Sequence, residues 1–285
     1  MNAGVHALSG RVLLVATELG KLPAFVRRDF LVAWSYRLPF VSDWVNLILQ
    51  AFLFYFVGLM VDERVLPRFD GSPTTYMEFV AVGIALGAFI QIGLGRVAMA
   101  IRTEQVIGTL ESLMLTPTSP VTIQIGSAAY DLIYVPLRTA IFFVIVALGF
   151  GLDLEASGAG PAAVILLLFI PFVWGLGIAA AAFTLTFRRG MGSVGFGVTL
   201  MTVFSGAYFP LDLLPSWAAA IAVANPIRVA VDGMREALLG GAGWSESSHA
   251  ILLLVPISAV SLAIGLFAFR SALARERRRG TLGLY

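Results

Sequence analysis

Three residues that could carry charge or protons lie within one long apolar stretch of the sequence, residues 121–150. Asp131, Tyr134 and Arg138 recur at helical spacing and therefore share one face of a helix. Ionisable side chains inside a membrane-spanning helix are costly, so they are usually paired and often mark an ion, proton or substrate path. Asp131 and Arg138 are two turns apart, too far for an ideal local ion pair. We expect each to meet a partner on another helix or in a watery cavity, either holding the helices together or acting in gating.

The sequence lacks the residue patterns on which most enzymatic reactions depend. There are no cysteines, and the two histidines, His6 and His249, are far apart and outside any HExxH pattern. A thiolate nucleophile, a disulfide and a zinc site are therefore not expected. Lys21 is the only lysine, and Leu22 and Pro23 follow it, so it does not belong to a phosphate-binding P-loop. Without a GxSxG motif or paired aspartates, a membrane hydrolase is not expected either. We predict no catalytic residue, metal or ATP site.

The elements that must position the polar residues are membrane-spanning helices. Hydrophobic residues make up 59% of the 285 residues and charged residues 13%, and the mean hydropathy is +0.90. An ordinary soluble domain is about one quarter charged, so this class is excluded. Apolar stretches of about 20 residues are long enough to cross a bilayer. The predicted fold class is all-α integral membrane, a single transmembrane domain over residues 1–285 with six spans, at about 41–61, 76–100, 121–150, 161–187, 191–209 and 249–269.

Small and polar side chains mark the faces through which these spans should contact each other. In the first span polar residues recur at i, i+3 and i+7 from Asp43, so we expect their face to turn inward. In the second, glycines recur every four residues, which favours close helix packing or lines a substrate path. The residues that we assign to the translocation path or to an interface are Asn46, Gln50, Gln91, Asp131, Tyr134, Arg138, Thr199 and Thr202.

A shorter amphipathic segment precedes the first span, at residues 22–38. Pro23 suits the first turn of a helix, and the apolar residues that follow recur at helical spacing while the arginines point elsewhere. An arginine-rich amphipathic helix with aromatic residues suits a membrane surface. A plain polar lead-in to the first span is the alternative. The residues of this interfacial helix that we single out are Arg27, Arg28, Trp34 and Arg37.

Residues 208–243 are too polar and too rich in proline to form a full span. We expect short re-entrant helices, split near Asn225, that dip into the outer leaflet and return. A loop that lies on the outer surface is the alternative. The residues of this segment that we single out are Tyr208, Phe209, Pro210, Asn225 and Pro226.

The distribution of charge predicts the orientation in the membrane. Arginine gathers in segments that would share one side, namely the interfacial helix, residues 101–120, Arg188-Arg189 and the tail 270–279. Most acidic residues fall in the connections at 62–75, 151–160 and 210–248. The positive-inside rule then places both termini in the cytosol. The basic tail alone suggests nucleic acid. After a span it more simply faces anionic lipids, so membrane lipids and no nucleic acid are expected as partners.

The segment between the second and third spans, residues 101–118, has the features of a docking helix. Thr103 is a suitable N-cap, and Pro117 disfavours helix at the residue before it. The apolar residues suit a partner's groove and the glutamates suit cationic side chains at its rim. A helix that lies on the membrane is the alternative. The docking residues are Glu104, Gly108, Thr109, Leu110, Glu111, Leu113, Thr116 and Pro117.

The same segment, EQVIGTLESLMLTPTSP, resembles the E-x-x-x-G-T-L-E-x-L-x-x-T-P signature of ABC-2 type exporter membrane subunits. Three further stretches resemble this family in the right order: FVRRDFLVAWSYR, SGAYFPLDLLPSW and ANPIRVAVDGMREAL. The sequence departs from the family at Gln105-Val106-Ile107, where members often carry more charge. The resemblance covers most of the chain.

The resemblance implies a permease subunit of an exporter in the cytoplasmic membrane of a prokaryote, multi-pass and paired with a second permease subunit. A separate ATP-binding subunit would hold ATP and Mg and push on residues 101–118, the coupling helix. The interfacial helix would lie near that ATPase, and residues 208–243 would form the outer gate. The expected cargo is an amphiphilic drug or a lipid-like molecule, with a glycolipid or polysaccharide as the other possibility.

An ion-coupled secondary transporter with Asp131 as its proton site is the alternative function. Such carriers need carboxylates near the middle of the membrane and often contain internal repeats. The sequence offers one suitable carboxylate and no convincing repeat. Gradient-driven transport that is lost in Asp131→Asn would favour this alternative.

Overall fold

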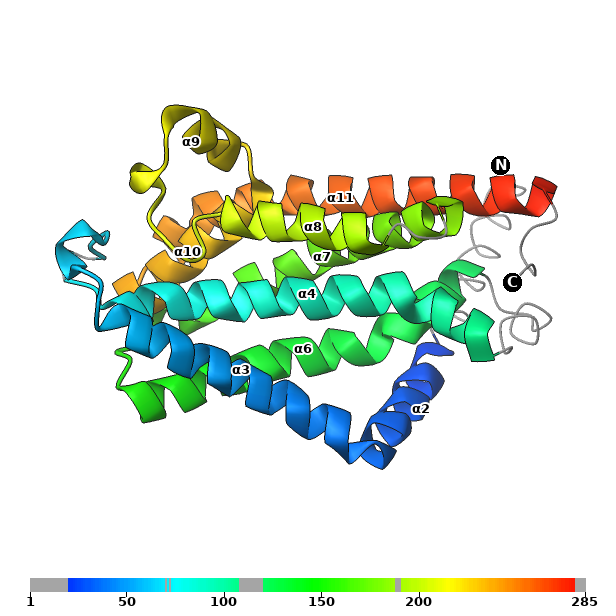
Figure 1. The fold of residues 1–285 in the computed structure, drawn as a ribbon, viewed down its shortest axis with the longest axis horizontal. Coiled ribbons are helices and arrows are strands. Elements are labelled where there is room, and N and C mark those ends of the chain that lie inside the picture. Colours follow the sequence, from blue (N-terminus) through cyan, green and yellow to red (C-terminus); the bar gives the residue numbers. More distant parts are fainter. Residues whose placement is uncertain (1–19, 70, 72, 108–119, 188–190, 280–285) are drawn as a thin grey trace, which may run out of the picture.

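The protein folds as a bundle of long helices that lie roughly side by side (Figure 1). The computed structural model describes residues 20–69, 71, 73–107, 120–187 and 191–279, and these contain α-helices and short 3-10 helices but no β-strand. In chain order the elements are α2 (Leu22–Ser35), α3 (Arg37–Gly58), η1 (Glu63–Val65), α4 (Tyr76–Ile107), α6 (Pro120–Phe150), η2 (Ala156–Gly158), α7 (Ala159–Phe187), α8 (Met191–Val203), η3 (Leu211–Leu213), α9 (Ser216–Val223), α10 (Pro226–Gly240) and α11 (Trp244–Arg279).

Among the described residues, five helical segments are long and apolar enough to cross a bilayer. They are Arg37–Gly58, Tyr76–Gly95, Ala129–Phe150, Ala156–Phe187 and Trp244–Arg275. The sequence-based prediction of an all-α membrane protein is therefore confirmed. The predicted fifth span is shorter than expected, because α8 has 13 residues and ends at Val203 instead of near residue 209. A helix of that length rises only about 20 Å, against about 30 Å of hydrocarbon. The chain turns at residues 204–209, where Gly206 has a φ of +76°.

Helix α4 is the central helix of the bundle, and nearly all its residues from Tyr76 to Leu94 are buried. It packs against α3, α6, α7 and α10. The glycine stripe of this helix serves close packing at its first two members. A Cβ atom on Gly83 would lie 1.9 Å from the carbonyl oxygen of Ala207, and one on Gly87 would lie 3.0 Å from the hydroxyl of Tyr208. A Cβ on Gly95 would meet nothing within 4 Å.

Helices α7 and α11 form the closest helix pair. A Cβ atom on Gly265 would lie 2.3 Å from the carbonyl oxygen of Gly175, so the two backbones approach as only small residues permit. Ser258 donates a hydrogen bond of 2.6 Å to the carbonyl of Leu168, and Ser261 donates one of 2.9 Å to that of Phe172. These contacts fix α11 along the length of α7.

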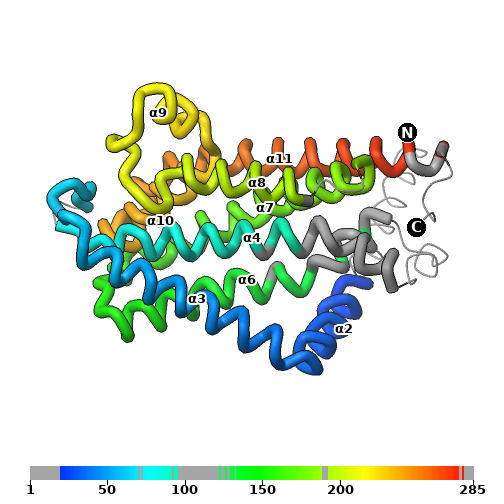
Figure 2. The backbone as a smooth tube through the Cα atoms, in the orientation of Figure 1, coloured from blue at the N-terminus to red at the C-terminus, as the bar shows by residue number. Residues whose placement is uncertain are grey.

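The two ends of the bundle differ in shape. Figure 2 shows α9 and α10 at one end, together with the turn that follows α8, whereas α2 lies toward the other end beside the start of α6. Helix α2 occupies the predicted interfacial segment and stops at Tyr36, whose φ of −102° and ψ of 75° separate it from α3. None of the residues of α2 is buried. Its location at the membrane surface stays a prediction.

Candidate functional site

The predicted docking segment is described only at its beginning. Residues 101–107 continue α4 to Ile107, so no helix begins at Thr103 and its expected role as N-cap is wrong. The reason is that no glycine or proline interrupts α4 between Gly95 and Gly108. The side chain of Glu104 lies outside the described part, as do residues 108–119, which hold Gly108, Thr109, Leu110, Glu111, Leu113, Thr116 and Pro117. Their coupling role stays a prediction.

Arg138 has a partner on another helix, as we expected for an arginine inside an apolar stretch. Its Nε lies 2.9 Å from Oδ2 of Asp43 on α3, and its Nη2 donates to Oδ1 of Asp43 at 3.1 Å and to the Asp43 carbonyl at 3.3 Å. The hydroxyl of Tyr134 also donates to Oδ2 of Asp43 at 3.4 Å. Arg138 is 4% exposed and the Asp43 side chain 31%. This network joins the first and third long helices. Asp131, on the same helix, is buried too.

A cavity of about 440 Å³ lies beside this network, between α2, α3 and α6. Two of the four predicted interfacial residues, Trp34 and Arg37, line it, and the Arg37 guanidinium lies 5.7 Å from the centre of the Trp34 ring. The other two, Arg27 and Arg28, are exposed on α2, and Arg28 pairs with Asp29 at 2.7 Å. The aromatic residues that line the cavity are Phe30, Trp34, Phe40, Trp44, Tyr130 and Tyr134.

The other polar residues predicted for a translocation path do not converge within one chain. Asn46 and Gln91 are exposed and Gln50 is half-buried, whereas α3 buries Leu47 and Ala51. Within one chain, the polar face of α3 therefore does not turn inward at Asn46, and the role of Asn46 in the path or at an interface stays a prediction. Helix α3 meets the bundle along a narrow line of residues four apart, and Asn46 lies to one side of it.

The two threonines predicted for the path bind their own helix. Thr199 donates to the carbonyl of Gly195 at 3.0 Å, and Thr202 donates to that of Val198 at 2.9 Å. Thr199 is exposed and Thr202 is buried. Their hydroxyls are thus satisfied inside α8, as is common for threonine in apolar helices.

The predicted gate residues come together at the end of the bundle where α9 and α10 lie. The ring of Tyr208 stacks on Phe54 with centroids 5.4 Å apart, and its carbonyl accepts a hydrogen bond of 3.0 Å from Tyr76. Phe209 is half-buried and Pro210 is buried beside it.

Asn225 lies between α9 and α10 and binds two helix ends. Its Oδ1 accepts from the Ile227 N–H at 3.0 Å and so caps α10, where Pro226 takes the first position. Its Nδ2 donates at 2.6 Å to the carbonyl of Met201 near the end of α8. The predicted split of the segment near Asn225 thus corresponds to two short helices. Their depth in the membrane stays a prediction.

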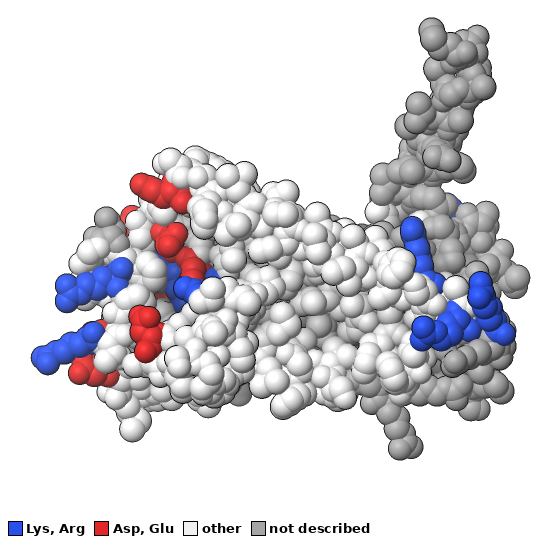
Figure 3. Space-filling model, turned by 90° about the horizontal axis from the view of Figure 1, so that it is seen from above, with Lys and Arg blue, Asp and Glu red and all other residues white. Residues whose placement is uncertain are grey.

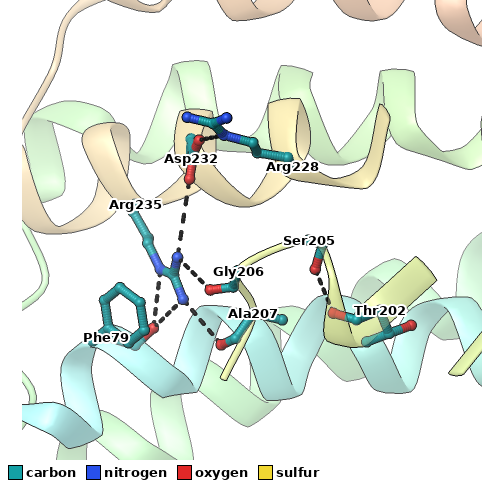
Figure 4. Close-up of polar contacts among 8 residues, drawn as sticks. All are labelled: Phe79, Thr202, Ser205, Gly206, Ala207, Arg228, Asp232 and Arg235. Atoms are coloured by element: carbon teal, nitrogen blue, oxygen red, sulfur yellow. Dashed lines mark hydrogen bonds and ion pairs between the residues drawn. The ribbon is translucent and has the colours of Figure 1, made fainter. Parts of the chain in front are cut away.

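A residue that the sequence analysis did not single out, Arg235 on α10, holds this end together. Its guanidinium donates to the carbonyl oxygens of Phe79 (3.0 and 2.9 Å), Gly206 (3.0 Å) and Ala207 (3.0 Å), as Figure 4 shows. It also lies 3.5 Å from the centre of the Phe79 ring, and a carboxylate oxygen of Asp232 is 4.0 Å away. The sequence feature that pointed to Arg235 was the Asp-x-x-Arg pattern in the ANPIRVAVDGMREAL stretch.

Arg235 carries its charge although it is only 3% exposed. Burial lowers the pKa of Arg235 to about 9, while the nearby negative charge of Asp232 acts to raise it. The guanidinium therefore stays protonated at neutral pH. The oxygens of three carbonyls, from α4 and from the turn after α8, accept hydrogen bonds from the guanidinium and so take the place of water around its charge. The result is a three-way joint of α10, the start of α4 and the turn after α8.

These sites offer binding and mechanical coupling but no bond chemistry. Among the described residues, no group of three or more His, Asp or Glu side chains could hold a metal ion. Five segments that are long and apolar enough to span a bilayer, joined by an interhelical ion pair and packed helix joints, define a polytopic membrane protein. A family model described as ABC-2 type transporter matches residues 21–239, and no curated protein sequence matches the chain. The chain belongs to the ABC-2 type transporter family, and it is a multi-pass membrane permease of an ABC transporter.

Proposed function

We propose that this permease works as a dimer that forms the export path, driven by a separate subunit that binds ATP and Mg. The family match over residues 21–239 carries this proposal, because ABC-2 permeases normally pair with an ATP-binding subunit. The surroundings of Lys21, the only lysine, agree with it, since they do not form a P-loop. The expected location is the cytoplasmic membrane of a prokaryote.

The charge distribution supports an orientation with both termini in the cytosol. In the view of Figure 3, the acidic side chains of the described residues gather at one end of the molecule, whereas the other end shows only basic ones. The basic end includes the end of α11, with the exposed Arg270, Arg275 and Arg278. The positive-inside rule places this end in the cytosol.

In this orientation, α4 connects a cytosolic coupling segment to the outer end. Its 32 residues span about 48 Å and run from Tyr76 to Ile107, so the helix contains Glu104 and ends directly before the other predicted coupling residues. Near its outer end, the carbonyl of Phe79 binds Arg235 of α10. A push on the cytosolic end of this buried helix would therefore move the joint that holds the predicted outer gate.

The polar residues left exposed in the spans support a second permease subunit. Asn46 and Gln91 are exposed in a single chain although they lie in apolar helices. Polar side chains in a membrane are expected to face other helices or a water-filled path. A path between two subunits would place these side chains against a helix of the second subunit or against water. The mostly apolar side chains of the spanning helices favour an amphiphilic or lipid-like cargo over a polysaccharide.

Affinity purification in mild detergent, followed by mass spectrometry, tests the proposal. An ATPase should copurify in about 1:1 ratio and should be lost when residues 108–111 are replaced by alanine. Asp131→Asn is the matched control, because it should leave the ATPase bound. Purification of the chain without an ATPase, together with gradient-driven transport that Asp131→Asn abolishes, would overturn the proposal and favour the secondary transporter.

A further inference from the structure

The cavity between α2, α3 and α6 lies beside two contacts that join these helices. At one side, Phe25 of α2 packs on Gly126 of α6, where an added Cβ would lie 2.6 Å from the ring. At the other, Arg138 of α6 binds Asp43 of α3. The bend at Tyr36 leads α2 away from the axis of α3. The space that remains, about 440 Å³, is within the range of ligand pockets.

The interior of this cavity suits a hydrocarbon chain. Its walls are aliphatic and aromatic, and two of its tyrosines, Tyr130 and Tyr134, stack with centroids 5.5 Å apart and an interplanar angle of 11°. The Tyr134 hydroxyl donates to Asp43. Stacked rings held by a hydrogen bond form a stiff wall, which an acyl chain can contact without loss of side-chain freedom.

The charges around the cavity are positive. Arg37 and Arg138 line it and no carboxylate does. Asp43 neutralises Arg138, which is buried. Arg37 is exposed, and its contact in the structure is the face of Trp34. A guanidinium held over an aromatic ring beside an apolar cavity is placed to bind a phosphate group whose attached chain enters the cavity.

The surroundings point to the bilayer as the source of the occupant. Phe30, Leu31, Val32 and Trp34 on α2 are all more than half exposed, so this helix presents apolar side chains to its surroundings. Such a helix suits the level of lipid headgroups. Anionic lipids attract arginines at this level.

We infer that the cavity between α2, α3 and α6 binds one anionic phospholipid, with an acyl chain against Tyr130 and Tyr134 and the phosphate on Arg37. The lipid fills the gap between the two helix contacts and so sets the angle at which α2 leaves α3. This consequence for coupling rests on the proposed function, in which α2 lies near the ATPase. The binding itself does not.

Tryptophan quenching by brominated phospholipids tests the lipid site. Trp34 and Trp44 line the cavity, so the probe is the full chain with Phe in place of its other three tryptophans, reconstituted in phosphatidylcholine nanodiscs. Brominated phosphatidylglycerol should quench with about fivefold higher apparent affinity than brominated phosphatidylcholine, the effect of one arginine near a membrane surface. Arg37→Gln should abolish this preference, and Ala33→Phe, which fills the cavity, should weaken quenching by both lipids.

Arg27→Gln is the matched control, because Arg27 is an exposed arginine of α2 that does not line the cavity. It should retain the preference. Equal quenching by the two lipids, or equal loss of preference in both arginine variants, would overturn the site and leave a diffuse charge effect. Lipid retention after detergent washing, measured on the chain with all its tryptophans, should show the same difference between the variants. Neither readout needs ATP hydrolysis or transport, so this inference can fail while the proposed function holds.

Discussion

The end of the bundle around α10 and the end around α2 are built in different ways. At the α10 end, a buried arginine binds three backbone carbonyls, and glycines such as Gly83 lie so close to a neighbouring segment that an added Cβ would have less than 3 Å of space. At the α2 end, α2 buries no residue and α3 buries only Leu47 and Ala51. A cavity lies between these two helices and α6 beside the few contacts that join them.

This difference indicates which contacts the chain makes by itself and which it leaves to others. At the α10 end, Arg235 and Asn225 find their hydrogen-bond partners within the chain. The α2 end exposes apolar side chains, and the ion pair of Asp43 with the buried Arg138 joins α3 to α6 there. Lipids, a second subunit and an ATPase are therefore expected to act mainly on the α2 end.

Arg235→Met should cause the largest loss of stability. It removes the hydrogen-bond donors for three buried carbonyls. Breaking a buried charged network of this kind costs about 3–5 kcal/mol of folding free energy. Thermal unfolding in detergent, followed by tryptophan fluorescence, measures the loss. The control is Arg228→Met on the same helix, where only a partly exposed ion pair with Asp232 is lost and less than about 1 kcal/mol is expected. Equal losses in the two variants would show that the α10 end is not locked by Arg235.

Gly83→Ala should come next in size. Its Cβ would lie 1.9 Å from the Ala207 carbonyl oxygen, so α4 and the turn after α8 must separate, at a cost of about 1–3 kcal/mol. Gly95→Ala, in the same helix, meets nothing within 4 Å and should instead stabilise by about 0.5–1 kcal/mol. Opposite shifts of the unfolding temperature would sharpen the contrast between tightly packed and open parts of α4. Shifts of the same sign would contradict it.

The Asp43–Arg138 pair should contribute less than the Arg235 joint. A double-mutant cycle of Asp43→Asn and Arg138→Gln is expected to give a coupling energy of about 1 kcal/mol. The value is modest because the Asp43 side chain is 31% exposed and partly screened. A coupling energy as large as the loss in Arg235→Met would mean that the α2 end is locked as firmly as the α10 end.

Glu236→Gln should have the smallest effect, and the effect should depend on pH. Partial burial raises the pKa of Glu236 above its ordinary 4.5, and Asp232 adds to this while His249 opposes it. The folded state therefore holds this proton more tightly, so the stability of the wild type falls as pH rises from 4.5 through the raised pKa. The variant should gain in unfolding temperature relative to the wild type at about pH 8 but not at about pH 4. A gain that is independent of pH would contradict this assignment.

The main features of the fold follow from side-chain patterns that are local in the sequence. Apolar stretches of span length place α3, α4, α6, α7 and α11, because a helix in lipid satisfies its backbone within its own segment. Pro226 and Asn225 place the start of α10 in the same way, since the cap lies next to the helix that it caps. The family signature around Gly108 is also local, so the order of residues in that one segment is enough to indicate the family.

The partners of polar residues could not be read in this way. Arg138 clearly needed a partner, but Asp43 is 95 residues away, and helix periodicity gives a face without saying what it meets. Arg235 gave even less signal, because its partners are backbone carbonyls that any residue carries. The length of α8 was overestimated because apolar residues continue past the point where Ser205 and Gly206 turn the chain.

Composition and short runs of residues are enough to establish that this is a polytopic α-helical membrane protein of the ABC-2 permease type, and they contain no P-loop. Packing between distant segments decides that Gly83 lies against Ala207 and that Arg235 joins α10 to α4. It also leaves Asn46 outside the packed face and opens a cavity beside Arg37. These properties depend on distances between residues far apart in the chain, which local sequence does not record.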